Sequence, residues 1–378
     1  GAATVSGTYG ITAGGPVTDS GTQEIAGITT ISASGQNVTL DTATNNFADE
    51  VRITGAAVTI VDEDAIDLGT STVSGAYTLT AGGDVTNSGA LAVTGATTVS
   101  ATGRNVTLNT ATNNFQGAVG ITGANVSVVD AGAIVLGAST VSGTYAVTAT
   151  ASGGITDAGV LAITGTSTLK AAGGQSIILD ESSTFATVAF VASSGNLKNV
   201  EIKDSNAFDL SALALAKVGG AGGDLTVIAG GAVTNSGTLV IPGAATISAS
   251  GQAVTLDDSS NDFGTLAITG ANVEIIDTNA IILGAATVSG TYSVTADGAI
   301  TNSGTQEITG VTTLVAGSGN DITLNTSTNN FAAAVVITSG RNVAITDEDT
   351  IDLGAATVSG TYGITAGGPV TDSGTQEI

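Results

Sequence analysis

The sequence predicts an all-β fold in which the chain winds as a parallel β-solenoid, and three observations lead to this prediction. The chain repeats itself with a period of about 70 residues. Short runs in which β-branched and polar residues alternate recur throughout, for example Val58-Thr59-Ile60-Val61. Glycine is abundant, at 54 of 378 residues, whereas aromatic residues make up 3% and charged residues 10%. An interior of Val, Ile, Leu, Ala and Thr suits a narrow, regular space better than an irregular globular core.

The repeat is the strongest of these observations. Residues 1–25 reappear without change at 354–378. Between these copies a unit recurs that contains a V-S-G-[TA]-Y phrase and ends in a leucine. The tyrosines are Tyr9, Tyr77, Tyr145, Tyr292 and Tyr362, and the leucines are Leu68, Leu136, Leu210, Leu283 and Leu353. We therefore expect one continuous solenoid over 1–378, with units 1–68, 69–136, 137–210, 211–283 and 284–353 and a partial unit 354–378, excerpted from a longer tandem array.

Each unit divides into three pieces of about 20 to 25 residues, each with two or three strand runs broken by Gly, Asn, Asp or Ser. A piece this short cannot bury an apolar face alone, so it must stack on its neighbours. This division predicts about three coils per unit and about 16 coils in all. Gly35 and Gly103 stand at predicted corners, where tight turns need a left-handed backbone. A propeller is the competing repeat architecture, but its blades are about 40–45 residues long.

The repeats resemble those of the filamentous haemagglutinins, the long repetitive adhesins of Gram-negative bacteria. The phrases that carry the resemblance are Leu-Thr-Ala-Gly-Gly at 79–83, Val-Thr-Asn-Ser-Gly at 85–89 and Ile-Thr-Gly-Ala-Asn-Val at 121–126. The resemblance implies a right-handed β-helix that is exported across the outer membrane and lies at the cell surface or outside the cell. The export route stays open, since a partner barrel and a barrel of the protein's own are both known in such families.

Composition and charge exclude several functions. The formal net charge is -25, which opposes binding to nucleic acid or to an anionic membrane surface. The chain has no His and no Cys, so a His-based catalytic triad and a His- or Cys-ligated metal are excluded. No apolar run approaches the ~20 residues of a membrane span.

Carboxylates provide the remaining candidate chemistry. Asp62-Glu63-Asp64 and its copy Asp347-Glu348-Asp349 are the densest acidic sites, but the equivalent positions are Asp130-Ala131-Gly132 and Asp277-Thr278-Asn279. A group that only some copies retain is typical of surface variation, so we expect Asp62, Asp130, Asp277 and Asp347 to be solvated turn caps, three coils apart. Residues 316–323 resemble a calcium-binding nonapeptide. Structural calcium is thus an alternative, but the favoured prediction is no cofactor, no metal residue and no catalytic residue.

Other recurring residues are assigned to structure. Asn45-Asn46, Asn113-Asn114 and Asn329-Asn330 precede Phe anchors, and we expect the Asn side chains to cap corners and the Phe rings to pack inside; a glycan-binding face is the alternative. We expect the tyrosines to pack at corners. Segment 186–222 lacks the Tyr phrase and is expected to contain a distorted coil, or else a lateral contact.

The sequence thus predicts a non-enzymatic extracellular fibre or adhesin stalk, in which stacked coils give length and stiffness. One alternative is an adhesin module whose repeats themselves bind carbohydrate or cells. A remote alternative is a polysaccharide-cleaving β-helix enzyme. The partners expected are further copies of the repeat along the chain, with lateral self-association or surface glycans as further options.

Overall fold

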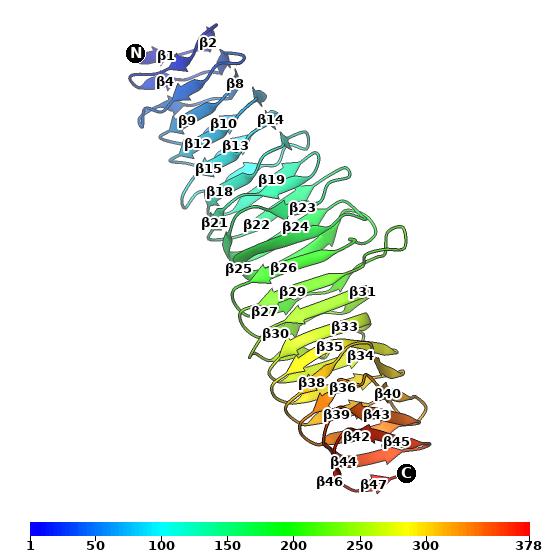
Figure 1. Ribbon diagram of the computed structural model, residues 1–378. Coiled ribbons are helices and arrows are strands. Elements are labelled where there is room, and N and C mark those ends of the chain that lie inside the picture. Colours follow the sequence, from blue (N-terminus) through cyan, green and yellow to red (C-terminus); the bar gives the residue numbers. More distant parts are fainter. The chain divides into compact units, whose positions relative to one another are not determined.

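The computed structural model describes all residues 1–378, which divide into two compact units, Gly1–Gly195 and Asn196–Ile378. Each unit consists of short β-strands joined by turns, and no helix is present. Every ladder between named strands is parallel, and the strands of each unit stack turn upon turn (Figure 1). The chain makes about 19 turns, and the predicted parallel β-solenoid is confirmed.

The strands of the first unit stack in three columns. Column I contains β1 (Ala3–Val5), β4 (Gln23–Ile25) and β7 (Asn46–Phe47) and ends there. Column II contains β2 (Tyr9–Thr12), β5 (Thr29–Ser32) and β8 (Val51–Gly55) and then divides in two. One branch continues as β10 (Ile66–Leu68), β13 (Val85–Asn87), β16 (Val106–Leu108), β19 (Val126–Asp130) and β22 (Tyr145–Ala149), and the other as β11 (Ser71–Val73), β14 (Leu91–Val93) and β17 (Asn114–Phe115), where it ends. Column III contains β3 (Val17–Thr18), β6 (Val38–Leu40), β9 (Val58–Asp62), β12 (Tyr77–Ala81), β15 (Thr97–Ser100) and β18 (Val119–Gly123), and then divides into β20 (Ile134–Leu136) with β23 (Ile155–Asp157), and β21 (Ser139–Val141).

Two long strands complete the first unit. β24 (Leu161–Ala171) pairs with both β21 and β22, and β25 (Ile177–Ala192) pairs with β23 and β24. Each of them therefore runs through a corner and serves more than one column.

The second unit has the same architecture. Its strands are β26 (Val200–Asp204), β27 (Phe208–Leu210), β28 (Leu213–Ala214), β29 (Leu225–Ala229), β30 (Val233–Asn235), β31 (Leu239–Ser248), β32 (Val254–Leu256), β33 (Asp262–Gly270), β34 (Val273–Asp277), β35 (Ile281–Val288), β36 (Tyr292–Ala296), β37 (Ile300–Asn302), β38 (Gln306–Ile308), β39 (Thr312–Val315), β40 (Ile322–Leu324), β41 (Asn330–Phe331), β42 (Val335–Gly340), β43 (Val343–Asp347), β44 (Ile351–Val358), β45 (Tyr362–Ala366), β46 (Val370–Asp372) and β47 (Gln376–Glu377).

The turn is shorter than the sequence predicted. In column III the residues that stack on one another are Val17, Val38, Val58, Tyr77, Thr97 and Val119. Their numbering shows that one turn takes roughly 20 residues, at the short end of the range for solenoid repeats. The expected coil of about 20 to 25 residues came from dividing each repeat into three pieces. The strand β10 was counted within the third piece, whereas it begins a turn of its own.

One sequence repeat contains ten strands, β1–β10 in the first copy and β11–β20 in the second. The ladder from β2 through β5, β8, β10, β13, β16 and β19 to β22 makes seven turns and covers two repeats, so one repeat makes about three and a half turns. The prediction of about three coils per repeat and about 16 coils was therefore too low. Equivalent segments of neighbouring repeats lie in different columns, because in each repeat one column ends and another divides.

Alternation along the strands builds the core. In β9, Val58, Ile60 and Asp62 are buried whereas Thr59 and Val61 are less so, and most longer strands follow this pattern. Gly35 and Gly103 have φ of 71° and 73°, so both predicted corners use the left-handed region that favours glycine.

The tyrosines belong to this core. Tyr77, Tyr145 and Tyr292 are each at most 2% exposed, as predicted for packing residues. Each stacks on a small hydroxyl residue of the next turn: Tyr77 on Thr97, Tyr145 on Ser167 and Tyr292 on Thr312. The unit without a Tyr phrase has Leu225 on Ala245 at the same place. The two positions change together, as expected of residues that share one packing space.

Candidate functional site

The recurring aspartates close the ends of strand columns. Column I is interrupted after β7, and no strand pairs with it in the following turn. Instead the carboxylate of Asp62 accepts a hydrogen bond from Phe47 N–H at 2.8 Å and another from Asp64 N–H at 2.9 Å. The side chain thus takes the place of the missing strand carbonyl, which a buried N–H requires.

The same junction recurs in later repeats. Phe115 N–H donates to Asp130, Phe263 N–H to Asp277, and Phe331 N–H to Asp347, over 2.6, 2.8 and 2.8 Å respectively. All four aspartates are at most 2% exposed. The prediction that they are turn caps is confirmed, but the prediction that they are solvated is wrong, because each lies beneath a column end instead of on a surface turn. They also do not form one column: Asp62 caps column I and Asp130 caps column II.

Burial perturbs these carboxyls. Desolvation raises the pKa of Asp62 to about 6, against the hydrogen bonds from the Phe47 and Asp64 N–H groups, which lower it. Burial likewise raises the pKa of Asp130 and of Asp277. Carboxyl groups with shifted pKa values are common in active sites. These carboxyl groups, however, face the interior and accept hydrogen bonds from backbone N–H groups. Their geometry is that of a structural cap.

At each junction a buried asparagine beside the Phe anchor bonds to the preceding turn. Asn45, Asn113, Asn261 and Asn329 are fully buried, and their Oδ1 atoms accept hydrogen bonds from the N–H groups of Gln23, Leu91, Leu239 and Gln306 at 2.8–3.0 Å. The rings of Phe47, Phe115, Phe263 and Phe331 are at most 1% exposed. Corner capping by the Asn side chain and inward packing of Phe are therefore confirmed.

A second set of side chains forms a polar ladder along a corner of the first unit. Asp84 accepts a hydrogen bond from Asn105 N–H at 2.9 Å, Asn105 accepts one from Asn125 Nδ2 at 2.9 Å, and Asn125 accepts one from Thr144 N–H at 3.0 Å. These residues line a shallow groove of about 310 Å³. Since each polar group is engaged with the next turn, the ladder mainly holds turns together.

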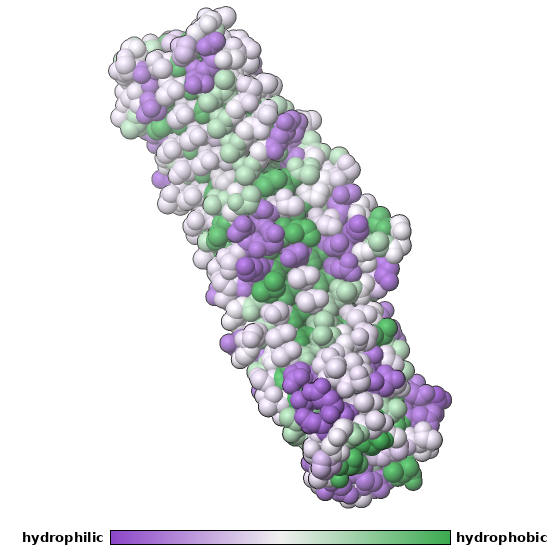
Figure 2. Space-filling model, viewed as in Figure 1, coloured by the Kyte–Doolittle hydropathy of each residue, from purple (hydrophilic) through white to green (hydrophobic).

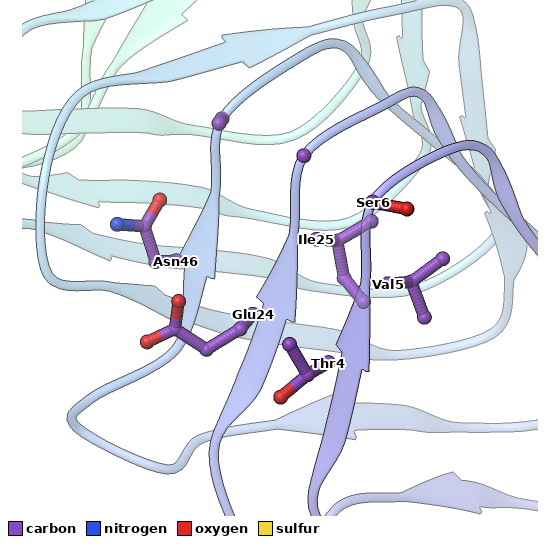
Figure 3. A pocket seen from close by; sticks show the side chains of 8 residues that line it. Thr4, Val5, Ser6, Glu24, Ile25 and Asn46 are labelled. Atoms are coloured by element: carbon purple, nitrogen blue, oxygen red, sulfur yellow. The ribbon is translucent and has the colours of Figure 1, made fainter.

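A further groove of about 280 Å³ lies over β1, β4 and β7. Figure 3 shows Thr4, Glu24 and Asn46 side by side on these three strands. Residues Thr357 and Glu377, the identical copies of Thr4 and Glu24, line a similar groove in the second unit. The groove of Figure 3 has a single carboxylate, Glu24, and so lacks the pair that glycoside hydrolysis requires.

The calcium-like phrase is occupied by an ion pair. Asp321 receives hydrogen bonds from Nε and Nη2 of Arg341 at 2.8 and 2.9 Å, and from Asn342. The hydrogen bond from Arg341 lowers the pKa of the partly exposed Asp321 to about 2. No cluster of three or more His, Cys, Asp or Glu residues is arranged to hold a metal ion.

The segment that breaks the repeat contains a glycine-rich loop in the second unit. Gly219, Gly220, Gly222 and Gly223 all have positive φ, and Val218 and Ala221 form an isolated antiparallel bridge. This loop replaces the Tyr phrase between β28 and β29. The expected distorted coil is thus found in the part of the segment that begins at Asn196.

The visible faces of both units mix hydrophilic and hydrophobic residues in small groups (Figure 2). No helix long and apolar enough to span a membrane is found.

Comparison with known proteins identifies the repeat but no function. A family model described as repeats of unknown function (DUF5649) matches residues 1–54, 55–122, 123–192, 197–269, 270–338 and 340–378. From the second match on, each begins at a constant interval before one of the unit-ending leucines, so the matches follow the period that those leucines define. No curated protein and no solved structure matches the chain.

Proposed function

Because the chain belongs to the DUF5649 family of repeats of unknown function, we propose its role from its own geometry: it is a structural segment of an extracellular fibre or adhesin stalk. The observation that carries this proposal is that the recurring polar side chains form hydrogen bonds between neighbouring turns. Asp62, Asn45 and the Asp84–Asn105–Asn125 ladder all bond to backbone or side chains of neighbouring turns. The recurring chemistry thus holds coils together.

A stalk needs stiffness and a length that can be set. Parallel ladders join each turn to the next, and buried side chains close the column ends that the ladders leave open. Each repeat contacts mainly its neighbours, so adding or removing repeats changes length without rebuilding a core. The resemblance to filamentous haemagglutinins and the absence of cysteine agree with an exported bacterial surface protein.

Catalysis is not part of the proposal. The groove over β1, β4 and β7 contains one carboxylate, and the buried aspartates face away from solvent. The net charge of -25 favours solubility and discourages association with acidic polymers.

Deletion of one repeat tests the proposal. A variant of the 378-residue chain that lacks residues 55–122 should keep its β-sheet circular dichroism and cooperative unfolding. Its largest dimension in small-angle X-ray scattering should fall by about 17 Å, which is three and a half turns at ~4.8 Å each. Adhesion of the chain to cells or matrix, where it is detected, should be unchanged.

Two results would overturn the proposal. Loss of adhesion on deletion of this one repeat would show that the repeat itself binds the ligand. Loss of the folded state, in both this variant and one that lacks residues 270–338, would show that repeats are not interchangeable segments of a stalk.

A further inference from the structure

Equivalent residues of neighbouring repeats lie in different columns of the solenoid. Tyr9 is on β2 in column II and Tyr77 is on β12 in column III, whereas Tyr145 is on β22, which belongs to column II again. The second unit behaves alike: Tyr292 stacks between Val273 and Thr312, whereas Tyr362 stacks on Val343 in another column.

The outward residues follow the same rule. Thr39 and Thr107 occupy the same place in the phrase Val-Thr-Leu of the first and second repeats. Thr39 lies in column III, where it pairs with Thr59, but Thr107 lies in column II, where it pairs with Thr86 and Ser127. The column ends capped by Asp62 and Asp130 are shifted in the same way.

We infer that the repeat acts as a half-turn screw: each repeat presents its surface groups about half a turn further round the solenoid than the repeat before it. The inference follows from the continuous ladder β2–β5–β8–β10–β13–β16–β19–β22, which joins the equivalent strands β2 and β22 of the first and third repeats in seven turns. The same group therefore returns to the same side after two repeats, which is about 34 Å at ~4.8 Å per turn. A repeated groove is displayed alternately on two sides of the solenoid instead of along one face.

This display selects the kind of partner that can use the repeats. A rigid partner that spans two neighbouring repeats would meet two different surfaces, because the equivalent groups lie about half a turn apart. A ligand that occupies the surface of a single repeat meets an equivalent site in every regular repeat, alternately on two sides of the solenoid. The repeats thus suit small ligands bound one per repeat, and the inference stands whether or not the chain is a stalk.

Spin-label distances test the screw directly, and the chain has no cysteine to interfere. One double variant, T39C/T107C, labels equivalent positions of two repeats. The reference, T39C/T98C, labels one column, since Thr39, Thr59, Thr78 and Thr98 stack in succession. The axial separations are similar, roughly 17 and 14 Å. The equivalent pair is also separated across the solenoid, by roughly 13–17 Å for faces of four to five residues at ~3.3 Å each.

Dipolar spectroscopy should therefore give a mean distance about 8 Å longer for T39C/T107C than for T39C/T98C. Mean distances that agree within about 3 Å, or a shorter distance for T39C/T107C, would overturn the inference, since equivalent residues would then share a column. Circular dichroism verifies that each labelled chain is folded. The pair T78C/A146C, on β12 and β22, is a second equivalent pair that should also show the longer distance if the first variant does not fold.

Discussion

The carboxylate of Asp62 accepts the N–H of Phe47 at 2.8 Å, in the place where another strand would continue column I. This bond marks the point at which the chain completes nine strands and adds a tenth, β10, whose Leu68 meets Val51 of column II. Cap and extra strand together allow a sequence repeat that is not a whole number of turns.

Replacing this carboxylate should change how stability depends on pH. Burial raises the pKa of Asp62 to about 6 from 3.8, so the folded state binds the proton more tightly than the unfolded state. Its contribution to stability is therefore full below about pH 4 and is lost as pH rises through about 6. Two pKa units correspond to about 3 kcal/mol. Asp62→Asn should remove a decrease of this order between pH 4 and pH 7, measured by urea unfolding.

The matched control is Glu63→Gln, which removes the same charge from an exposed neighbour. It should keep the decrease of the parent chain. If both variants show the same pH dependence as the parent, Asp62 does not titrate as a buried cap.

The buried tyrosine hydroxyls should respond differently to removal. Tyr145 OH forms a hydrogen bond with Ser139, whereas the equivalent of Ser139 near Tyr292 is Ala286, and Tyr292 OH has no partner. Tyr145→Phe should cost about 1 kcal/mol of unfolding free energy, and Tyr292→Phe should be neutral or stabilising by about 1 kcal/mol. Equilibrium unfolding of the two variants provides the comparison, and an equal loss in both would contradict the assigned bonding.

Much of this architecture could be predicted from the sequence, because it depends on local pattern. Alternation in runs such as Val58–Val61 predicted strands, Gly35 predicted a left-handed corner, and the Tyr and Phe anchors predicted the core. The number of turns could not be predicted in this way, since strands as short as Ile66–Leu68 carry too little alternation to be separated from their neighbours. Burial of Asp62 also escaped prediction, because it depends on where a column ends. Its sequence signal is the Asp that follows the Phe anchor at the same interval in the first two repeats, Phe47 to Asp62 and Phe115 to Asp130.

Glycines at stacked corners should be sensitive to a single added methyl group. A Cβ on Gly82 would lie 2.0 Å from the carbonyl oxygen of Glu63 in the preceding turn, whereas a Cβ on Gly10 would meet nothing within 4 Å. Gly82→Ala should destabilise the chain by about 2 kcal/mol or more, because the turns must move apart. Gly10→Ala should be neutral or slightly stabilising. Thermal unfolding of both variants tests the close approach of the turns, and equal midpoints would contradict it.

Calcium should have little effect on the fold. The oxygens of Asp321 are engaged by Arg341 and Asn342, so a bound ion would have to displace an ion pair. Millimolar calcium should leave the unfolding midpoint of the chain unchanged within about 1 °C. A shift of that size corresponds to a change in unfolding free energy well below about 1 kcal/mol. A larger increase that is abolished by chelation, and also by Asp321→Asn, would establish a calcium site at this phrase.

X-ray diffraction from an aligned film of the 378-residue chain tests the central claim, a stack of parallel coils that forms a stalk, most directly. Since each turn advances the chain by one strand spacing, a reflection at ~4.8 Å should lie along the direction of alignment. A ~4.8 Å reflection at right angles to that direction, or none at all, would contradict the stacking of coils along the stalk.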